Sequence, residues 1–265
     1  MKQLLCLLLL LPAMAFSETK LKTLVLEENN TISFNNAFTS RYVAKKQVEA
    51  MTLCSKNPNS EINLVLHTPG GSVTAGKRFF DTLRALPCKF NTITIFAASM
   101  GYQTVQNLGS RYIIPSGVLM SHRAFVRGIG GEIGGELDSI IKHIKDDVNE
   151  LDIIAAKRIG QSLQDYKASI ADELWMTSSV AKEGNHVDEV VLLKCGISLS
   201  GTRLESVVNL FGRFDVEFSK CPLVTAPLRV LRGYGNANYS AFLQMFESPM
   251  PLVREIFNYY NNVKR

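Results

Sequence analysis

A serine that follows an apolar run is the first residue in this chain that could do chemistry. The run Thr92–Ala97 has the composition of a buried strand, and Ser99 follows it at the start of a segment with helical spacing. At such a strand-to-helix turn a hydroxyl can act as a nucleophile, and the helix N-terminus would stabilise the oxyanion that forms. Most serines in such places only cap the helix, so the assignment needs a base nearby.

The chain offers four histidines as candidate bases for a serine nucleophile. His143 lies in a charged helical segment and His186 in a polar turn, so both are expected at the surface. His122 directly follows the apolar strand Val118–Ser121. His67 precedes a glycine loop at the end of another strand and competes with His122 for the role.

That glycine loop is the second place where chemistry is expected. Thr68-Pro69-Gly70-Gly71-Ser72 follows the apolar strand Ile62–Leu66. Paired glycines let the backbone approach a substrate closely, and their N–H groups can bind an oxyanion. We therefore expect Gly70 and Ser72 to contact substrate, although a plain tight turn would have the same composition.

Apolar strands alternate with helical patterns along most of the chain, which predicts an α/β fold with a parallel sheet. The carboxyl ends of parallel strands share one edge, so the loops named above should meet there. We divide the chain into an N-terminal segment (1–15), an α/β domain that bears these loops (16–195) and a mostly α-helical C-terminal extension (196–265). The expected strands are 23–26, 31–34, 62–66, 92–97, 112–114, 118–121 and 187–193; the expected helices are 39–53, 74–86, 100–108, 138–159, 163–171 and 178–183.

Three ordered motifs resemble the proteolytic subunit of the Clp protease. They are the glycine loop Thr68–Gly76, the turn Ala97-Ala98-Ser99-Met100-Gly101, and the strand end Met120-Ser121-His122. Glu173–Thr177 also looks like the segment that bears that family's third catalytic residue, and the similarity covers roughly residues 22–193. The resemblance implies a Clp-protease/crotonase-like spiral of βαβ units.

The family's catalytic roles transfer to this chain residue by residue. Ser99 would attack the carbonyl, His122 would take its proton, and the N–H groups of Gly71 and Met100 would form the oxyanion hole. His67 then becomes a residue of the substrate pocket. The family usually has aspartate as the third member; counting back from Met176-Thr177 gives Glu173, which we prefer, and Asp172 fits after a one-residue shift.

The N-terminus and the cysteines favour an exported protein. A basic start, the apolar run Leu4–Leu11 and the sequence Ala13-Met14-Ala15 are typical of a cleavable signal peptide. The four remaining cysteines then suit an oxidising compartment, and we favour the disulfides Cys54–Cys88 and Cys195–Cys221 because each stays within one region. The sequence contains no CxxC pair of the kind that would indicate a zinc site. The net charge of +5 does not indicate nucleic-acid binding.

These observations predict an exported serine endopeptidase of the periplasm or cell exterior that cleaves peptides or unfolded proteins. It would need no cofactor, would form a homo-oligomer, and would work without an ATP-driven unfoldase because ATP is absent outside the cytoplasm. Two alternatives remain open. One is a protease like signal peptide peptidase with a Ser–Lys dyad, and the other is a catalytically inactive scaffold or binding protein of the same fold. A crotonase acting on acyl-CoA shares the fold but fits neither export nor the Ser/His pair.

Overall fold

The computed structural model describes residues 21–126, 132–209, 212–240 and 242–243. The predicted signal peptide (1–15) lies outside these residues. Within them, no helix has the length and apolar character needed to cross a membrane.

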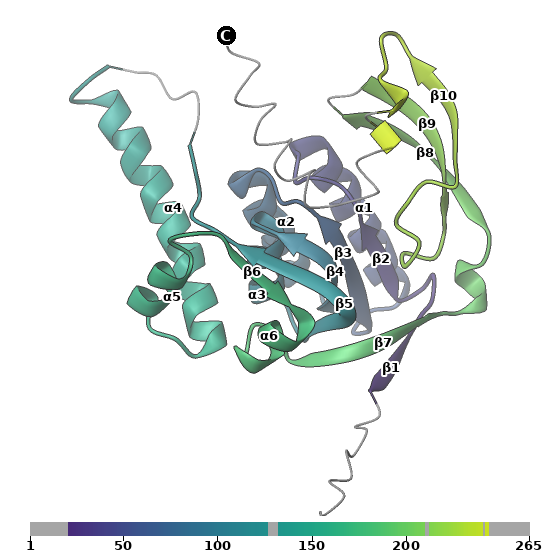
Figure 1. The fold of residues 1–265 in the computed structure, drawn as a ribbon, viewed down its shortest axis with the longest axis horizontal. Coiled ribbons are helices and arrows are strands. Elements are labelled where there is room, and N and C mark those ends of the chain that lie inside the picture. The colour runs from purple at the N-terminus through teal and green to yellow at the C-terminus, as the bar shows by residue number, and fades with distance from the viewer. Residues whose placement is uncertain (1–20, 127–131, 210–211, 241, 244–265) are drawn as a thin grey trace, which may run out of the picture.

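A seven-stranded sheet with the order β1-β7-β5-β4-β3-β2 forms the centre of the fold, and β6 pairs with β5 beside it (Figure 1). All pairs are parallel except β5–β6. The α/β class and the parallel sheet predicted from the sequence are therefore confirmed. The strands are β1 (Lys22–Leu26), β2 (Thr31–Phe34), β3 (Glu61–Thr68), β4 (Lys89–Ala98), β5 (Arg111–Ser121), β6 (Leu174–Thr177) and β7 (Glu189–Cys195).

Helices cover one face of this sheet and share a large apolar core with it. The core joins Phe34 and Leu66 of the strands to Phe79 of α2 and Ala155 of α4, all of them fully buried. Local interactions set the ends of the helices. The Ser72 hydroxyl caps the start of α2, and Gly160 ends α4 in the left-handed conformation. The helices are α1 (Ser40–Lys56), α2 (Val73–Ala85), α3 (Met100–Asn107), α4 (Glu136–Ile159), α5 (Leu163–Ser169) and α6 (Ser178–Glu183).

The two N-terminal strands lie at opposite edges of the sheet. β1 pairs with β7, and β2 pairs with β3. The chain therefore crosses from one edge to the other between them, and the Asn-rich turn at 28–30 does not close a hairpin.

The C-terminal extension differs from its prediction. Its described part is an antiparallel sheet of β8 (Thr202–Asn209), β9 (Gly212–Ser219) and β10 (Arg229–Tyr234), next to the short helix η1 (Ile197–Leu199). The expectation of a mostly α-helical extension is wrong there, because β9 alternates buried Phe214, Val216 and Phe218 with polar residues in the period of a strand. Lys45 of α1 and Glu205 of β8 form an ion pair of 3.8 Å that links this sheet to the main body.

Both predicted disulfides are present. Cys54–Cys88 joins the end of α1 to the start of β4, and Cys195–Cys221 joins the end of β7 to the segment after β9. The second bond attaches the small sheet to the main sheet covalently.

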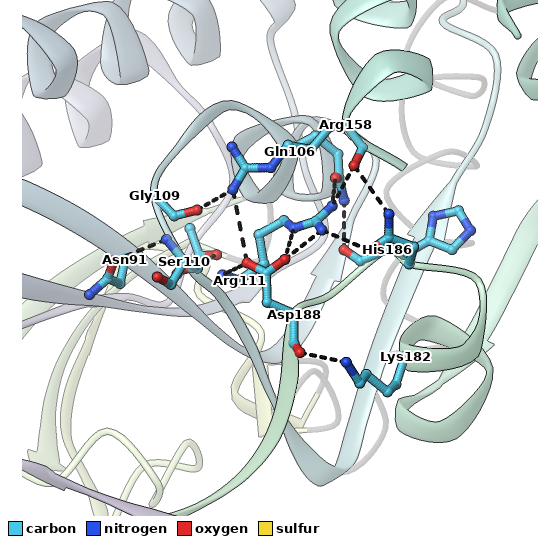
Figure 2. Close-up of polar contacts among 11 residues, drawn as sticks. Asn91, Gln106, Gly109, Ser110, Arg111, Arg158, Lys182, His186 and Asp188 are labelled. Atoms are coloured by element: carbon cyan, nitrogen blue, oxygen red, sulfur yellow. Dashed lines mark hydrogen bonds and ion pairs between the residues drawn. The ribbon is translucent and has the colours of Figure 1, made fainter. Parts of the chain in front are cut away.

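A buried arginine fixes the far end of α3, the helix that follows Ser99. Figure 2 shows Arg111, at the start of β5, paired with Asp188 at 2.6 Å and with Gln106 of α3 at 2.8 Å. Gln106 in turn donates to the carbonyl of His186 at 2.9 Å, and His186 is only 5% exposed, so the expectation that it lies at the surface is wrong. Because a buried charge is costly unless it is paired, this network holds α3 in one position relative to β5 and β7.

Candidate active site

Ser99 occupies the sharp turn between β4 and α3 with a strained backbone. Its φ of 56° and ψ of −116° are outside the regions that residues with a side chain usually adopt. Its N–H donates to the carbonyl of Met120 at 2.9 Å, and its hydroxyl makes no capping bond to α3. The Ser99 hydroxyl therefore does not cap α3, which was the alternative role considered for this serine.

His122 contacts this hydroxyl directly. Its Nε2 lies 2.8 Å from Ser99 Oγ. Parallel pairing explains the contact: Ala98 of β4 is in register with Met120 of β5, so the residues that follow these strand ends lie side by side. Burial lowers the pKa of His122, and the charge of Glu173 opposes that effect. A lowered pKa keeps the imidazole neutral at pH 7, the form that can accept a proton.

The glycine loop packs against the same turn. A side chain at Gly70, whose φ is +93°, would place a Cβ 2.6 Å from Ser99 Cβ and 2.9 Å from Met100 N. Gly71 is equally crowded against the backbone of Phe38, whose N–H donates to Gly70 O at 2.8 Å. Only glycines allow this approach, which brings the loop backbone next to the N–H of Met100.

The predicted carboxylates differ in their relation to His122. Both Asp172 and Glu173 are exposed just before β6. Glu173 accepts a hydrogen bond from Trp175 Nε1 at 3.0 Å, and its charge raises the pKa of His122. No such effect on His122 comes from Asp172, so the electrostatics favour Glu173 as the acidic partner.

His67 and Ser72 have surroundings that differ from a substrate pocket. His67 lies on β3 with its ring edge-to-face against Phe96 at 6.0 Å, and burial lowers its pKa to about 4. The Ser72 hydroxyl accepts from the N–H of Ala75 as the cap of α2. Among the described residues, neither one lines the cavity beside Ser99.

A small cavity next to Ser99 contains two polar residues that the sequence analysis missed. Asp152 of α4 and Gln103 of α3 line it together with Ser99 and His122. Asp152 falls on the buried stripe of α4 that also holds Leu151, Ala155, Ala156 and Ile159. A carboxylate on an apolar helical stripe was the signal that could have identified it. No group of three metal-ligating side chains occurs in the described part of the chain.

The family model for the Clp protease matches residues 18–193. The chain belongs to the Clp protease family. It is 30% identical over 158 residues to the ATP-dependent Clp protease proteolytic subunit 3 of Streptomyces coelicolor, covering 58% of this chain and 72% of that protein. It is 32% identical over 148 residues to the proteolytic subunit 2 of Nocardia farcinica, covering 54% and 71%. Membership of the Clp protease family makes this chain a homologue of serine peptidases, and the small sheet after residue 193 lies beyond the matched region.

Proposed function

We propose that this chain is a serine endopeptidase that hydrolyses peptides or unfolded proteins with Ser99, His122 and Glu173. The observation that carries the proposal is the 2.8 Å contact between Ser99 Oγ and His122 Nε2 at a strained turn. A contact of this length lets the imidazole take the hydroxyl proton as the oxygen attacks. Since Ser99 Oγ already contacts a histidine, a Ser–Lys dyad is the weaker alternative.

The proposed reaction has two halves. Ser99 Oγ attacks the scissile carbonyl carbon while its proton moves to His122 Nε2, and the N–H groups of Gly71 and Met100 stabilise the oxyanion. The C–N bond then breaks and the amine leaves with the proton from His122, so an acyl-enzyme remains. A water molecule, deprotonated by His122, hydrolyses this ester and restores Ser99. Glu173 stabilises the imidazolium that forms in each half through its charge.

Hydrolysis of a fluorogenic peptide without ATP tests this function. We expect turnover by the mature protein, and His122→Ala should lower kcat/KM by about 10⁴. The profile of kcat/KM against pH should have its acid limb below pH 6.5, because burial lowers the pKa of His122. Wild-type protein that cleaves no peptide, with or without ATP, would favour the inactive scaffold instead.

A matched pair of variants assigns the acid. Glu173→Gln removes the charge that raises the pKa of His122, so the acid limb should move to lower pH while the plateau falls. Asp172→Asn removes a neighbouring carboxylate that is also exposed, and it should change neither the acid limb nor the plateau. The opposite result would assign the acidic role to Asp172.

Export and assembly complete the proposal. The two disulfides support an oxidising compartment outside the cytoplasm. We expect a mature N-terminus near Phe16, activity without an unfoldase partner, and a homo-oligomer as in the Clp protease family. Sequencing the N-terminus of protein recovered from the periplasm or medium checks the first expectation, the peptide assay without ATP checks the second, and light scattering checks the third; intact protein retained in the cytoplasm would contradict export.

A further inference from the structure

A carboxylate without a donor from the described part of the chain lines the cavity beside Ser99. Asp152 is only 6% exposed, and its carboxylate forms no hydrogen bond or ion pair with any residue in the described part of the chain. Gln103 donates through Nε2 to the Tyr166 hydroxyl at 3.3 Å, but its Oε1 is buried and has no partner there. Because Gln103 Oε1 is sealed from the cavity, the carboxylate of Asp152 is the acceptor that a ligand there can reach.

The charged groups around Asp152 do not supply that donor. Lys167 is the cation whose charge acts on Asp152, yet its ammonium donates to Asn149 Oδ1 at 2.6 Å. Burial raises the pKa of Asp152 to about 6, with Lys167 opposing the effect, so the group is mostly ionised at neutral pH. An ionised, unpaired carboxylate on the apolar stripe of α4 destabilises the folded state, which is the pattern of a residue that serves a ligand.

The cavity places Asp152 where a substrate side chain would enter. It is lined by Ser99, His122, Gln103 and Asp152 and has a volume of about 30 Å³, room for little more than the head of a side chain. It shares Asp152, Val148 and Ala124 with a larger groove of about 710 Å³. Asp152 therefore lies where the cavity meets the groove. A substrate side chain next to the bond that Ser99 attacks could reach it.

The larger groove has charges of both signs, but they are arranged unevenly. Arg123, Lys145, Lys167 and Asp146 line it together with Asp152. Of these five charged residues, Asp152 alone also lines the cavity beside Ser99. A substrate side chain next to Ser99 therefore meets the negative charge of a carboxylate.

We infer that this peptidase prefers a lysine or arginine side chain immediately before the scissile bond, with its cation bound by Asp152. The inference rests on the proposed function and adds its substrate class. A basic side chain supplies the donors that the carboxylate lacks, whereas an apolar side chain leaves it unpaired and an acidic one is repelled. Its methylene groups would lie beside Val148, and its cation would reach the junction with the groove.

A pair of peptides that differ only in charge tests the preference. One has lysine before the cleaved bond and the other has norleucine, which has the same length without the amine. At pH 8, where Asp152 is ionised, wild-type protein should cleave the lysine peptide about 30-fold or more faster in kcat/KM. Asp152→Asn should reduce this ratio towards one. Glu150→Gln, which removes a carboxylate of the same helix that lines neither the cavity nor the groove and pairs with Lys77 at 2.7 Å, should leave the ratio unchanged.

The outcomes separate this inference from the function it rests on. Suppose that Ser99 reacts with an uncharged fluorophosphonate and that the protein cleaves the norleucine and lysine peptides equally fast. The proposed function then stands, and the preference is overturned. The preference is also overturned if Asp152→Asn leaves the ratio unchanged, or if that variant takes the label but cleaves neither peptide. A protein that neither reacts nor cleaves fails at the proposed function itself.

Discussion

Replacing Ser99 with glycine should stabilise the protein while abolishing its chemistry. The backbone at this position has φ 56° and ψ −116°, a conformation that costs a residue with a side chain roughly 1–3 kcal/mol and glycine almost nothing. Glycine also gains about 0.4–1 kcal/mol of conformational entropy in the unfolded chain, which opposes the gain. Compared with Ser99→Ala, which keeps the strain, Ser99→Gly should therefore be more stable by about 1 kcal/mol.

The alanine variant is the matched control because both variants lack the hydroxyl. Urea unfolding at pH 7.5 measures the difference, and a change in midpoint at a constant m-value shows that only stability has changed. By thermal unfolding the expected difference is about 2–4 °C. A glycine variant that is equal to or less stable than the alanine variant would show that the turn is not strained, and the reading of Ser99 as a preorganised nucleophile would lose its backbone argument.

Three further stability measurements follow from the structure. Removing the Cys54–Cys88 bond, which closes a separation of 34 residues, should cost about 3–4 kcal/mol in urea unfolding; a cost near zero would mean that the bond does not form in solution. Burial lowers the pKa of His186 to about 4, so stability should fall as pH drops from 6.5 towards 4, by at most about 3 kcal/mol, and His186→Asn should remove that loss. Burial raises the pKa of Asp152 from 3.8 to about 6, so its stability cost grows as pH rises between these two values and is complete above the higher one; Asp152→Asn should gain about 1–2 kcal/mol at pH 7.5, allowing for water in the adjoining groove, and nothing at pH 4.

The sequence predicted the parts of the site that depend on strand ends. Ser99 and His122 each follow an apolar strand, and parallel pairing of neighbouring strands was enough to predict that they meet. Gly70 was identified from its type, because only a glycine fits where the loop backbone approaches Ser99 Cβ. The cysteine pairing also followed from position along the chain.

What the sequence did not predict depends on contacts between distant segments. Gln103 and Asp152 are 49 positions apart and lie on two different helices. Only the packing of α3 against α4 brings both residues to the lining of one cavity. The strands of the extension were missed for a different reason. The alternation of Phe214, Val216 and Phe218 with charged residues is visible in the sequence and has the period of a strand, but the prediction of a mostly α-helical extension did not take it into account.

Mass spectrometry of the protein after treatment with a fluorophosphonate tests the central claim most directly. The account predicts one covalent adduct located on Ser99, absent from Ser99→Ala, and formed at least about a hundredfold more slowly in His122→Ala. An adduct on another residue, or an equal rate of labelling without the imidazole of His122, would contradict it.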